Sequence, residues 1–229
     1  MNRVGSNWLY LVVMGLTAMA SAANSLEATL AKMDQAAAGF TGLTADLRKV
    51  AYHEVLKDSD TDTGRLVLKR GKAHDIRMLL DIKEPDPKTY AFEPHKVEEY
   101  LPRAQTVQEY DPGKYKSLID QFLLLGFGST SKEILSSYSI SLGGPETIGS
   151  DKTTRLQLIP KSPEMLKYFN RVDLWISDAT GLPVQQKFFA PGGDYNLATY
   201  SNMKINPNLA DSDVRLNLPK GVKRERPQK

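Results

Sequence analysis

From Leu43 to the end of the chain, apolar residues recur at every second position in short runs that turn-forming residues separate. A period of two places neighbouring side chains on opposite faces of a β-strand, so each run has one apolar and one polar face. About eleven such runs can be recognised, at residues 43–47, 66–68, 76–82, 88–92, 97–101, 106–110, 156–158, 172–176, 184–188, 195–197 and 214–218. The pattern predicts an antiparallel sheet with a solvated face and an apolar face. Residues 58–64 and 143–145 are among the predicted turns.

Two regions follow a helical period instead. Residues 25–40 carry one apolar stripe, which predicts a helix that Gly39 and Gly42 end. Between residues 113 and 127, apolar residues at spacings of three and four predict a second helix; its apolar positions are Tyr115, Leu118, Ile119, Phe122, Leu123 and Leu125. Thr130 and Glu133 stand at capping-box spacing before a third, short helix.

These elements predict a fold of the α+β class. A curled antiparallel sheet with few helices leaves an open mouth, and the helix at residues 115–125 is the element available to cover it as a lid. We therefore expect an incomplete, unclosed antiparallel β-barrel of about eleven strands with a helical lid.

The first 22 residues predict a secretory signal peptide. Arg3 is the only charged side chain before an apolar stretch at residues 9–20, and Ala20-Ser21-Ala22 fits the A-x-A cleavage pattern. The stretch is shorter than the roughly 20 residues of a spanning helix. Because the chain has no cysteine, none is available for acylation at the cleavage site. We expect cleavage near Ala22, one mature domain over residues 23–229, and export to the periplasm of a bacterium; an uncleaved membrane anchor is the alternative.

The charge balance excludes one class of function. The formal net charge is +3, and loss of Arg3 with the signal peptide lowers it further. A nucleic-acid-binding domain would carry a much stronger basic bias, so no nucleic-acid partner is expected. The only basic cluster lies at residues 220–226. It is either a solvated tail or a docking patch for an anionic membrane or partner.

Motifs of enzymes and metal sites are missing. The sequence contains no H-E-x-x-H, G-x-S-x-G or P-loop motif, and without cysteine there is no thiol catalysis. His53, His74 and His95 are scattered without ligand spacing. Residues 58–64 resemble a calcium loop in their alternating acids, but Lys69 stands where the bidentate glutamate belongs. We expect an acidic hairpin turn there, and no catalytic residue, cofactor or metal.

Arg70 is the most informative single residue. Strand alternation places it on the same side as Leu66 and Leu68, so a guanidinium would lie at the rim of an apolar interior. Such a group needs acceptors, and main-chain carbonyls of the lid are the available ones. Those hydrogen bonds would hold the lid closed until a ligand breaks them. The alternative is that Arg70 extends to water at the end of its strand.

From Ser25 onward, the chain resembles the LolA family of periplasmic carriers of outer-membrane lipoproteins. The resemblance rests on the order of several short motifs after an amphipathic first helix. They are Leu43-Thr44-Ala45-Asp46-Leu47, Gly64-Arg65-Leu66-Val67-Leu68-Lys69-Arg70 (similar to G-x-L-x-V-K-R-P), the strand pair within residues 96–110, Leu158-Ile159-Pro160-Lys161 and Leu218-Pro219-Lys220-Gly221-Val222. Two features depart from the family: Gly71 replaces a proline, and residues 58–64 lengthen the first hairpin.

The resemblance implies an incomplete barrel with a lid that Arg70 holds shut. It also implies transfer of cargo from an inner-membrane releasing complex to an outer-membrane receptor. We therefore expect a monomeric, non-enzymatic carrier whose cavity shelters lipoprotein acyl chains. The expected cavity residues are Leu47, Leu66, Leu68, Met78, Leu80, Leu174 and Phe188. Relatives of one fold differ in ligand, so a carrier of free lipid or glycolipid and an envelope-stress sensor domain are the alternatives.

Overall fold

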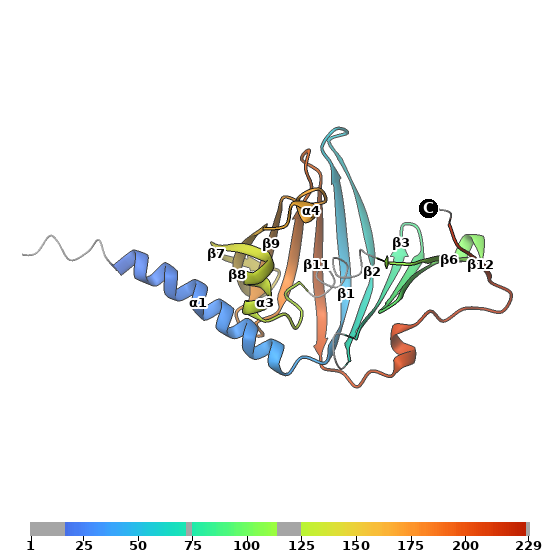
Figure 1. The fold of residues 1–229 in the computed structure, drawn as a ribbon, viewed down its shortest axis with the longest axis horizontal. Coiled ribbons are helices and arrows are strands. Elements are labelled where there is room, and N and C mark those ends of the chain that lie inside the picture. Colours follow the sequence, from blue (N-terminus) through green and yellow to red (C-terminus); the bar gives the residue numbers. More distant parts are fainter. Residues whose placement is uncertain (1–16, 72–74, 114–124, 228–229) are drawn as a thin grey trace, which may run out of the picture.

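The computed structural model describes residues 17–71, 75–113 and 125–227. Twelve strands form one sheet in the order β12-β6-β5-β4-β3-β2-β1-β11-β10-β9-β8-β7 (Figure 1). Their bounds are β1 Gly42–His53, β2 Asp58–Arg70, β3 Ile76–Glu84, β4 Lys88–Glu93, β5 Lys96–Leu101, β6 Thr106–Tyr110, β7 Tyr138–Ile148, β8 Asp151–Pro160, β9 Arg171–Ser177, β10 Pro183–Phe189, β11 Tyr195–Ile205 and β12 Lys223–Glu225. All neighbours are antiparallel except β12 and β6, which are parallel.

The sheet consists of two wings that meet at its centre. β1 pairs with β2 on one side and with β11 on the other. Strands β2 to β6 form one wing by successive hairpins, and strands β7 to β11 form the other. Because β12 and β7 are the two edges of the sheet, the barrel is unclosed. The expected open antiparallel architecture is confirmed.

The positions of the strands correct three sequence expectations. Residues 58–64 are not a turn: they belong to β2 and pair along β1, and the turn lies at residues 54–57. Residues 143–145 are not a turn either, because they lie inside β7, where the register shifts in a bulge. Residues 214–218 do not form a strand; a 3₁₀-helix, η3 Asp211–Val214, precedes an unpaired segment there.

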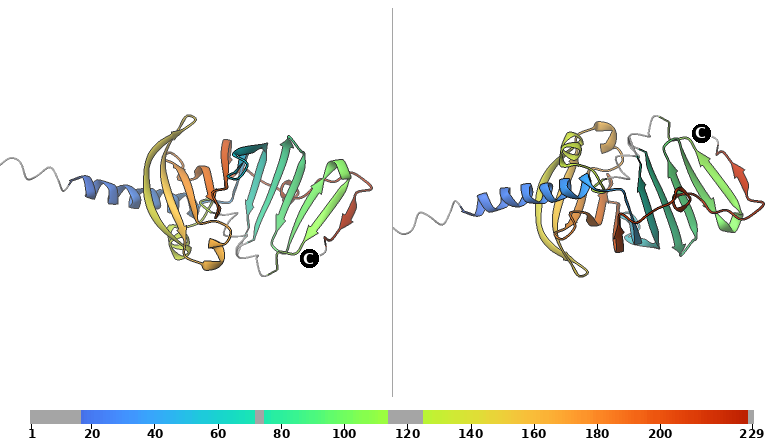
Figure 2. Two further views of the ribbon diagram at one scale, coloured as in Figure 1. Left: turned by 90° about the horizontal axis from the view of Figure 1, so that it is seen from above. Right: turned by 90° about the horizontal axis from the view of Figure 1, so that it is seen from below.

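Helices lie against the β7–β11 wing. Helix α1 Thr17–Ala38 passes across this wing in the view from below (Figure 2). It starts earlier than the expected residue 25 and ends just before Gly39. Helix α3 Ser131–Ser137 has the expected capping box, in which Thr130 and Glu133 satisfy each other's backbone N–H groups. Short elements complete the description: α4 Pro163–Leu166 and the 3₁₀-helix η1 Pro102–Ala104. No helix among the described residues is long and apolar enough to cross a membrane.

The buried apolar residues form two clusters. The first joins α1 and α3 to strands β8, β9 and β10; its fully buried members include Leu158, Val172 and Leu174. The second lies over β1, β2 and β3 and includes Phe40, Leu43 and Leu68. At about 25 cal/mol per Å² of buried apolar surface, such clusters supply most of the free energy that favours folding.

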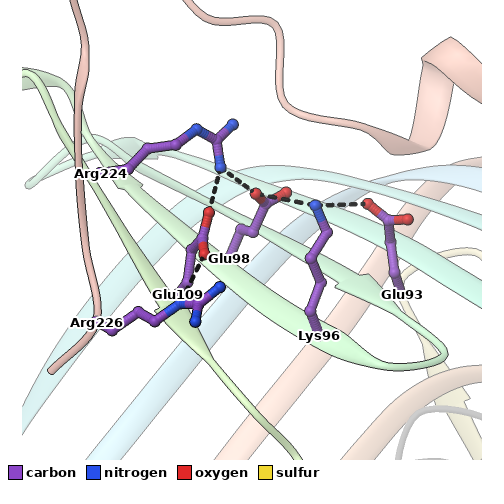
Figure 3. A network of polar contacts seen from close by, with 6 residues as sticks. All are labelled: Glu93, Lys96, Glu98, Glu109, Arg224 and Arg226. Carbon is purple, nitrogen blue, oxygen red and sulfur yellow. Dashed lines mark hydrogen bonds and ion pairs between the residues drawn. The ribbon is translucent and has the colours of Figure 1, made fainter. Parts of the chain in front are cut away.

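The C-terminal arm, residues 206–227, binds to the β2–β6 wing. Val214 is fully buried at η3, and Asp211 pairs with Lys69 at 2.6 Å. At the edge of the sheet, the arm ends in a network of ion pairs (Figure 3), which comprises Glu93, Lys96, Glu98, Glu109, Arg224 and Arg226. Two arginines of the basic cluster thus pair with the sheet edge, while their side chains stay exposed to solvent, as the solvated-tail interpretation expects.

Candidate functional site: an apolar cavity under a tethered segment

A cavity of about 550 Å³ lies on the face of the sheet that we call the inner face. Strands β1, β2, β3, β4, β10 and β11 contribute to its walls, so it spans the junction of the two wings. Its lining residues are Leu47, Lys49, Leu66, Met78, Leu80, Phe92, Phe127, Tyr168, Phe169, Gln186, Phe188, Ala190, Asn196, Ala198 and Tyr200. Most of these side chains are apolar, and the volume falls in the usual range of ligand sites, about 300–1,000 Å³.

The expected cavity residues divide into two groups. The structure places Leu47, Leu66, Met78, Leu80 and Phe188 in the lining. Leu68 and Leu174 are instead fully buried within the packed clusters. Strand alternation assigned both residues to the correct face, but it does not show where along a strand the interior is filled. For Leu174, the filling comes from the chain itself: a Cβ on Gly126 would lie 3.5 Å from its side chain.

Residues 125–128, here called the cover segment, lie over the junction of the wings. The chain between β6 and β7 joins the β2–β6 wing to the far edge of the sheet, and the cover segment is part of this connection. Phe127 of the segment is buried, lines the cavity and packs edge-to-face on Tyr200, with ring centroids 5.2 Å apart. Residues 125–128 form turns. The other predicted lid residues, Tyr115, Leu118, Ile119, Phe122 and Leu123, lie outside the described residues.

Two glycines allow the cover segment to approach the sheet closely. Gly126 and Gly128 have φ values of +81° and +73°, a conformation that side chains disfavour. A Cβ on Gly128 would lie 2.6 Å from the ring of Phe40 and 3.0 Å from Nη1 of Arg70. Only glycine at this position leaves room for the guanidinium to reach the main chain.

Arg70 contacts the cover segment directly. Its Nη1 donates a hydrogen bond to the carbonyl oxygen of Gly128 over 2.7 Å, and the side chain is half-buried. A main-chain carbonyl is the kind of acceptor that the sequence argument assigned to this guanidinium. The latch role itself remains a prediction.

Gln186 is a second tether, which sequence reasoning missed. Its Nε2 donates to the carbonyl oxygen of Leu125 over 2.6 Å, and its Oε1 accepts from the hydroxyl of Tyr200 over 2.8 Å. The side chain is only 4% exposed. Burial raises the pKa of the Tyr200 hydroxyl, which keeps it a donor. The signal was present: Gln186 occupies the apolar phase of its strand, between Val184 and Phe188.

The charged groups near the site form pairs. Lys49 at the edge of the lining pairs with Asp62 at 3.0 Å, and His53 lies 3.2 Å from Asp60 on the first hairpin. Within the described ranges, no group of three or more acidic, histidine or cysteine side chains could hold a metal ion. The site can therefore surround a hydrocarbon ligand, and the two tethers fix the segment that covers it.

Known proteins resemble this chain in fold but not detectably in sequence. No protein-family model matches the chain, and no curated protein sequence matches it. An uncharacterised conserved protein from Thermus thermophilus has a similar structure, with 13% identity, a TM-score of 0.56, and coverage of 89% of this chain and 99% of that one. MucB is similar at 12% identity and a TM-score of 0.51; the match covers 86% of this chain but only 63% of MucB.

The LolA superfamily is also represented among the similar structures. NE2245 from Nitrosomonas europaea, a member of that superfamily, matches at 12% identity and a TM-score of 0.40, with coverage of 83% of this chain and 97% of that one. At these identities, the likeness concerns the fold alone.

Proposed function

We propose that the protein is a non-enzymatic periplasmic carrier that shelters the acyl chains of lipoproteins and delivers them toward the outer membrane. The observation that carries this proposal is the apolar cavity on the inner face, covered by residues 125–128. The sequence resemblance to lipoprotein carriers supports the choice of cargo. By the same resemblance, the partners would be an inner-membrane releasing complex and an outer-membrane receptor.

The size of the cavity agrees with hydrocarbon cargo. At about 30 Å³ per small group, the liquid volume of a water molecule, 550 Å³ accommodates on the order of eighteen methylenes, or one long acyl chain. Each methylene that leaves water contributes about 0.8 kcal/mol, so a long chain in water is disfavoured by about 10 kcal/mol. A carrier must offset most of this free energy while it still releases the chain.

The cover segment supplies the balance between binding and release. In this structure, Phe127 fills part of the site, and Arg70 and Gln186 hold the two ends of the segment. Cargo that displaces Phe127 would break these hydrogen bonds, so the net affinity is the difference between cargo contacts and cover contacts. A ligand gains only this differential free energy between the two states.

The cargo can be identified by mass spectrometry of lipid extracted from the native purified protein. We expect acylated lipoprotein in the wild type and loss of it in Ala198→Phe, which fills the cavity from β11. Thr199→Phe, on the opposite face of the same strand, is the matched control and should retain cargo. Recovery of free lipid or glycolipid alone would reassign the cargo. A lipid-free protein that stably retains an inner-membrane protein partner would favour a sensor and refute the carrier.

A further inference from the structure

The apex of the first hairpin, residues 54–57, exposes two adjacent apolar side chains. Val55 is 91% exposed and Leu56 is 73% exposed, the largest values among the large hydrophobic residues that the structure describes. The β1–β2 hairpin extends beyond the neighbouring strands at its end of the sheet (Figure 1). Single exposed apolar residues are ordinary, but an adjacent pair at a projecting tip indicates a contact surface.

The apex is a turn held by specific polar contacts. Lys57 and Glu54 form an ion pair across it, so the two charges beside the apolar pair neutralise each other. The backbone N–H of Glu54 donates to Oδ1 of Asp194 over 2.7 Å, which ties the apex to the turn between β10 and β11. Neutralised charge lowers the cost of removing the apex from water.

Exposed apolar residues also flank the mouth of the cavity at the same end. Tyr168 lines the cavity and is 49% exposed, and Leu166 of α4 is also exposed. Helix α4 lies toward the end of the sheet from which the first hairpin projects (Figure 1). Lys49, another lining residue with an exposed side chain, lies on β1 on the apex side of Leu47. Exposed parts of the cavity lining therefore lie toward the end of the sheet from which the hairpin projects.

Behind the apex, aromatic rings and cations cover the outer face. Tyr52 stacks on Tyr195 with centroids 4.9 Å apart, and Nζ of Lys187 lies 3.6 Å from the centre of the Tyr195 ring. The guanidinium of Arg171 lies 3.8 Å from the centre of the Phe189 ring. Rings with cations beside them are the residues that proteins place at the level of lipid headgroups.

We propose that this end of the molecule contacts a phospholipid bilayer, with Val55 and Leu56 inserted between headgroups. The contact would bring the cavity mouth to the membrane, so its purpose rests on the proposed carrier function. Asp58, Asp60 and Asp194 lie near the apex, and their carboxylates are repelled by anionic lipid. The favoured surface is therefore zwitterionic, and the contact is transient.

Flotation with vesicles tests the contact directly. The mature chain should float with phosphatidylethanolamine–phosphatidylcholine vesicles, and added phosphatidylglycerol should weaken its binding. Val55→Ser combined with Leu56→Ser should reduce the partition coefficient at least about tenfold, because both apolar side chains then stay in water. Leu135→Ser is the control: it makes the same Leu-to-Ser change at an exposed position on α3. It should leave the partition coefficient unchanged.

A parallel titration with dansyl-undecanoic acid separates this inference from the proposed function. The double variant should bind the probe as the wild type does, because Val55 and Leu56 are not in the cavity lining. Vesicle binding without probe binding would refute the cavity function and leave the membrane contact standing. The proposal is overturned if the wild type does not float, or if the double variant floats equally well. A photo-crosslinker at position 55 that captures only a second copy of the chain would also overturn it.

Discussion

The two wings of the sheet each bury an apolar cluster on the inner face, but they differ in what else covers them. In the β7–β11 wing, the inner face of β8 and β9 is filled: Met33 of α1, Ile134 of α3 and Met165 of α4 belong to one cluster with fully buried residues such as Leu174. On the inner face of β2, β3 and β4, space is left open, and Leu80 and Phe92 line the cavity only half-buried.

The β2–β6 wing is supported on its outer face instead. Lys69 and Arg77, which contact Asp211 of the C-terminal arm, alternate with the inward-facing Leu68 and Met78. The arm thus supplies contacts on the outer face. The inner face of this wing is only partly packed, by the cluster that includes Leu68 and Met78, and the arm adds packing on the outer face. The inner face is therefore packed over β8 and β9 and borders the cavity over β3, β4, β10 and β11.

The largest expected difference between the wings is in packing energy. Leu174→Ala should lower the free energy of unfolding by about 2–5 kcal/mol, because the filled wing cannot collapse around the cavity it leaves. Leu80→Ala should cost less than about 2 kcal/mol, because its side chain already borders open space. Urea unfolding of both variants measures the contrast. Equal losses would show that the inner face of β3 is as tightly packed as that of β9.

A smaller effect is expected for Gln186, the buried residue that holds the cover segment. Gln186→Leu leaves the Leu125 carbonyl and the Tyr200 hydroxyl without their partner, so unfolding free energy should fall by about 1–3 kcal/mol. The neighbouring Gln185→Leu, on the outer face, is the control and should cost less than about 1 kcal/mol. Thermal unfolding measures both. A neutral Gln186→Leu would mean that water replaces the lost hydrogen bonds.

Arg70, the half-buried residue that holds the cover segment, should affect the release of bound lipid more than the stability of the fold. Arg70→Leu removes the hydrogen bond to Gly128. In the proposed function this bond competes with cargo, so dissociation of a bound fluorescent fatty acid should slow by up to about tenfold. Arg65→Leu, an exposed arginine on the outer face of the same strand, should release the probe at the wild-type rate. Stopped-flow displacement compares them. Unchanged release from Arg70→Leu would remove its latch role.

The smallest effect is expected at the edge of the β2–β6 wing, where Arg224 pairs with Glu109. The hydrogen bond from Arg224 holds the pKa of the Glu109 carboxyl below its usual value, with a further contribution from Arg226. This stabilisation is complete above the ordinary glutamate pKa and is lost as the pH falls through the lowered folded value, because the unfolded chain takes up the proton first. Since the pair is partly exposed, it is worth less than about 1 kcal/mol.

Arg224→Gln tests that dependence. The variant should be slightly less stable than the wild type at neutral pH, and the two should converge in acid. The difference should also shrink at high salt, which screens exposed charges. Urea unfolding measured across the acidic range provides the comparison. A difference that persists below the folded pKa would assign the effect to other contacts of Arg224, which include Glu98 at 2.7 Å, rather than to Glu109.

Much of the sheet follows from the sequence because strand alternation is local information. The strands β2 to β6 and β8 to β11 each contain one of the period-two runs of the sequence. Sequence-local rules failed where pairing overrode them. The acids of residues 58–62 are poor strand formers, yet they continue β2 because β1 offers partners along its whole length. In β7, a bulge absorbs Gly143-Gly144-Pro145, which locally predicts a turn.

The C-terminal arm and the two residues that contact the cover segment could be predicted only in part. Alternation at residues 214–218 correctly indicated one buried side, but the segment packs beside the sheet without joining it, so periodicity alone could not distinguish arm from strand. Arg70 was identified because a cation in an apolar phase is conspicuous. Gln186 is likewise a polar residue among apolar positions of its strand, but it carries no charge and is less conspicuous. Its partner, the Leu125 carbonyl, lies far away in the sequence, so no local pattern predicts the contact.

The pairing of β1 with β11 has a consequence for how the chain is completed. Leu43 faces Ile205 across this seam, so the central ladder joins segments separated by most of the polypeptide. Hairpins on either side can assemble from neighbours, but β1 keeps an unsatisfied edge until the last long strand arrives. Non-local closure of this kind slows folding. During synthesis, an N-terminal portion alone therefore lacks the partner strand that completes the centre of the sheet.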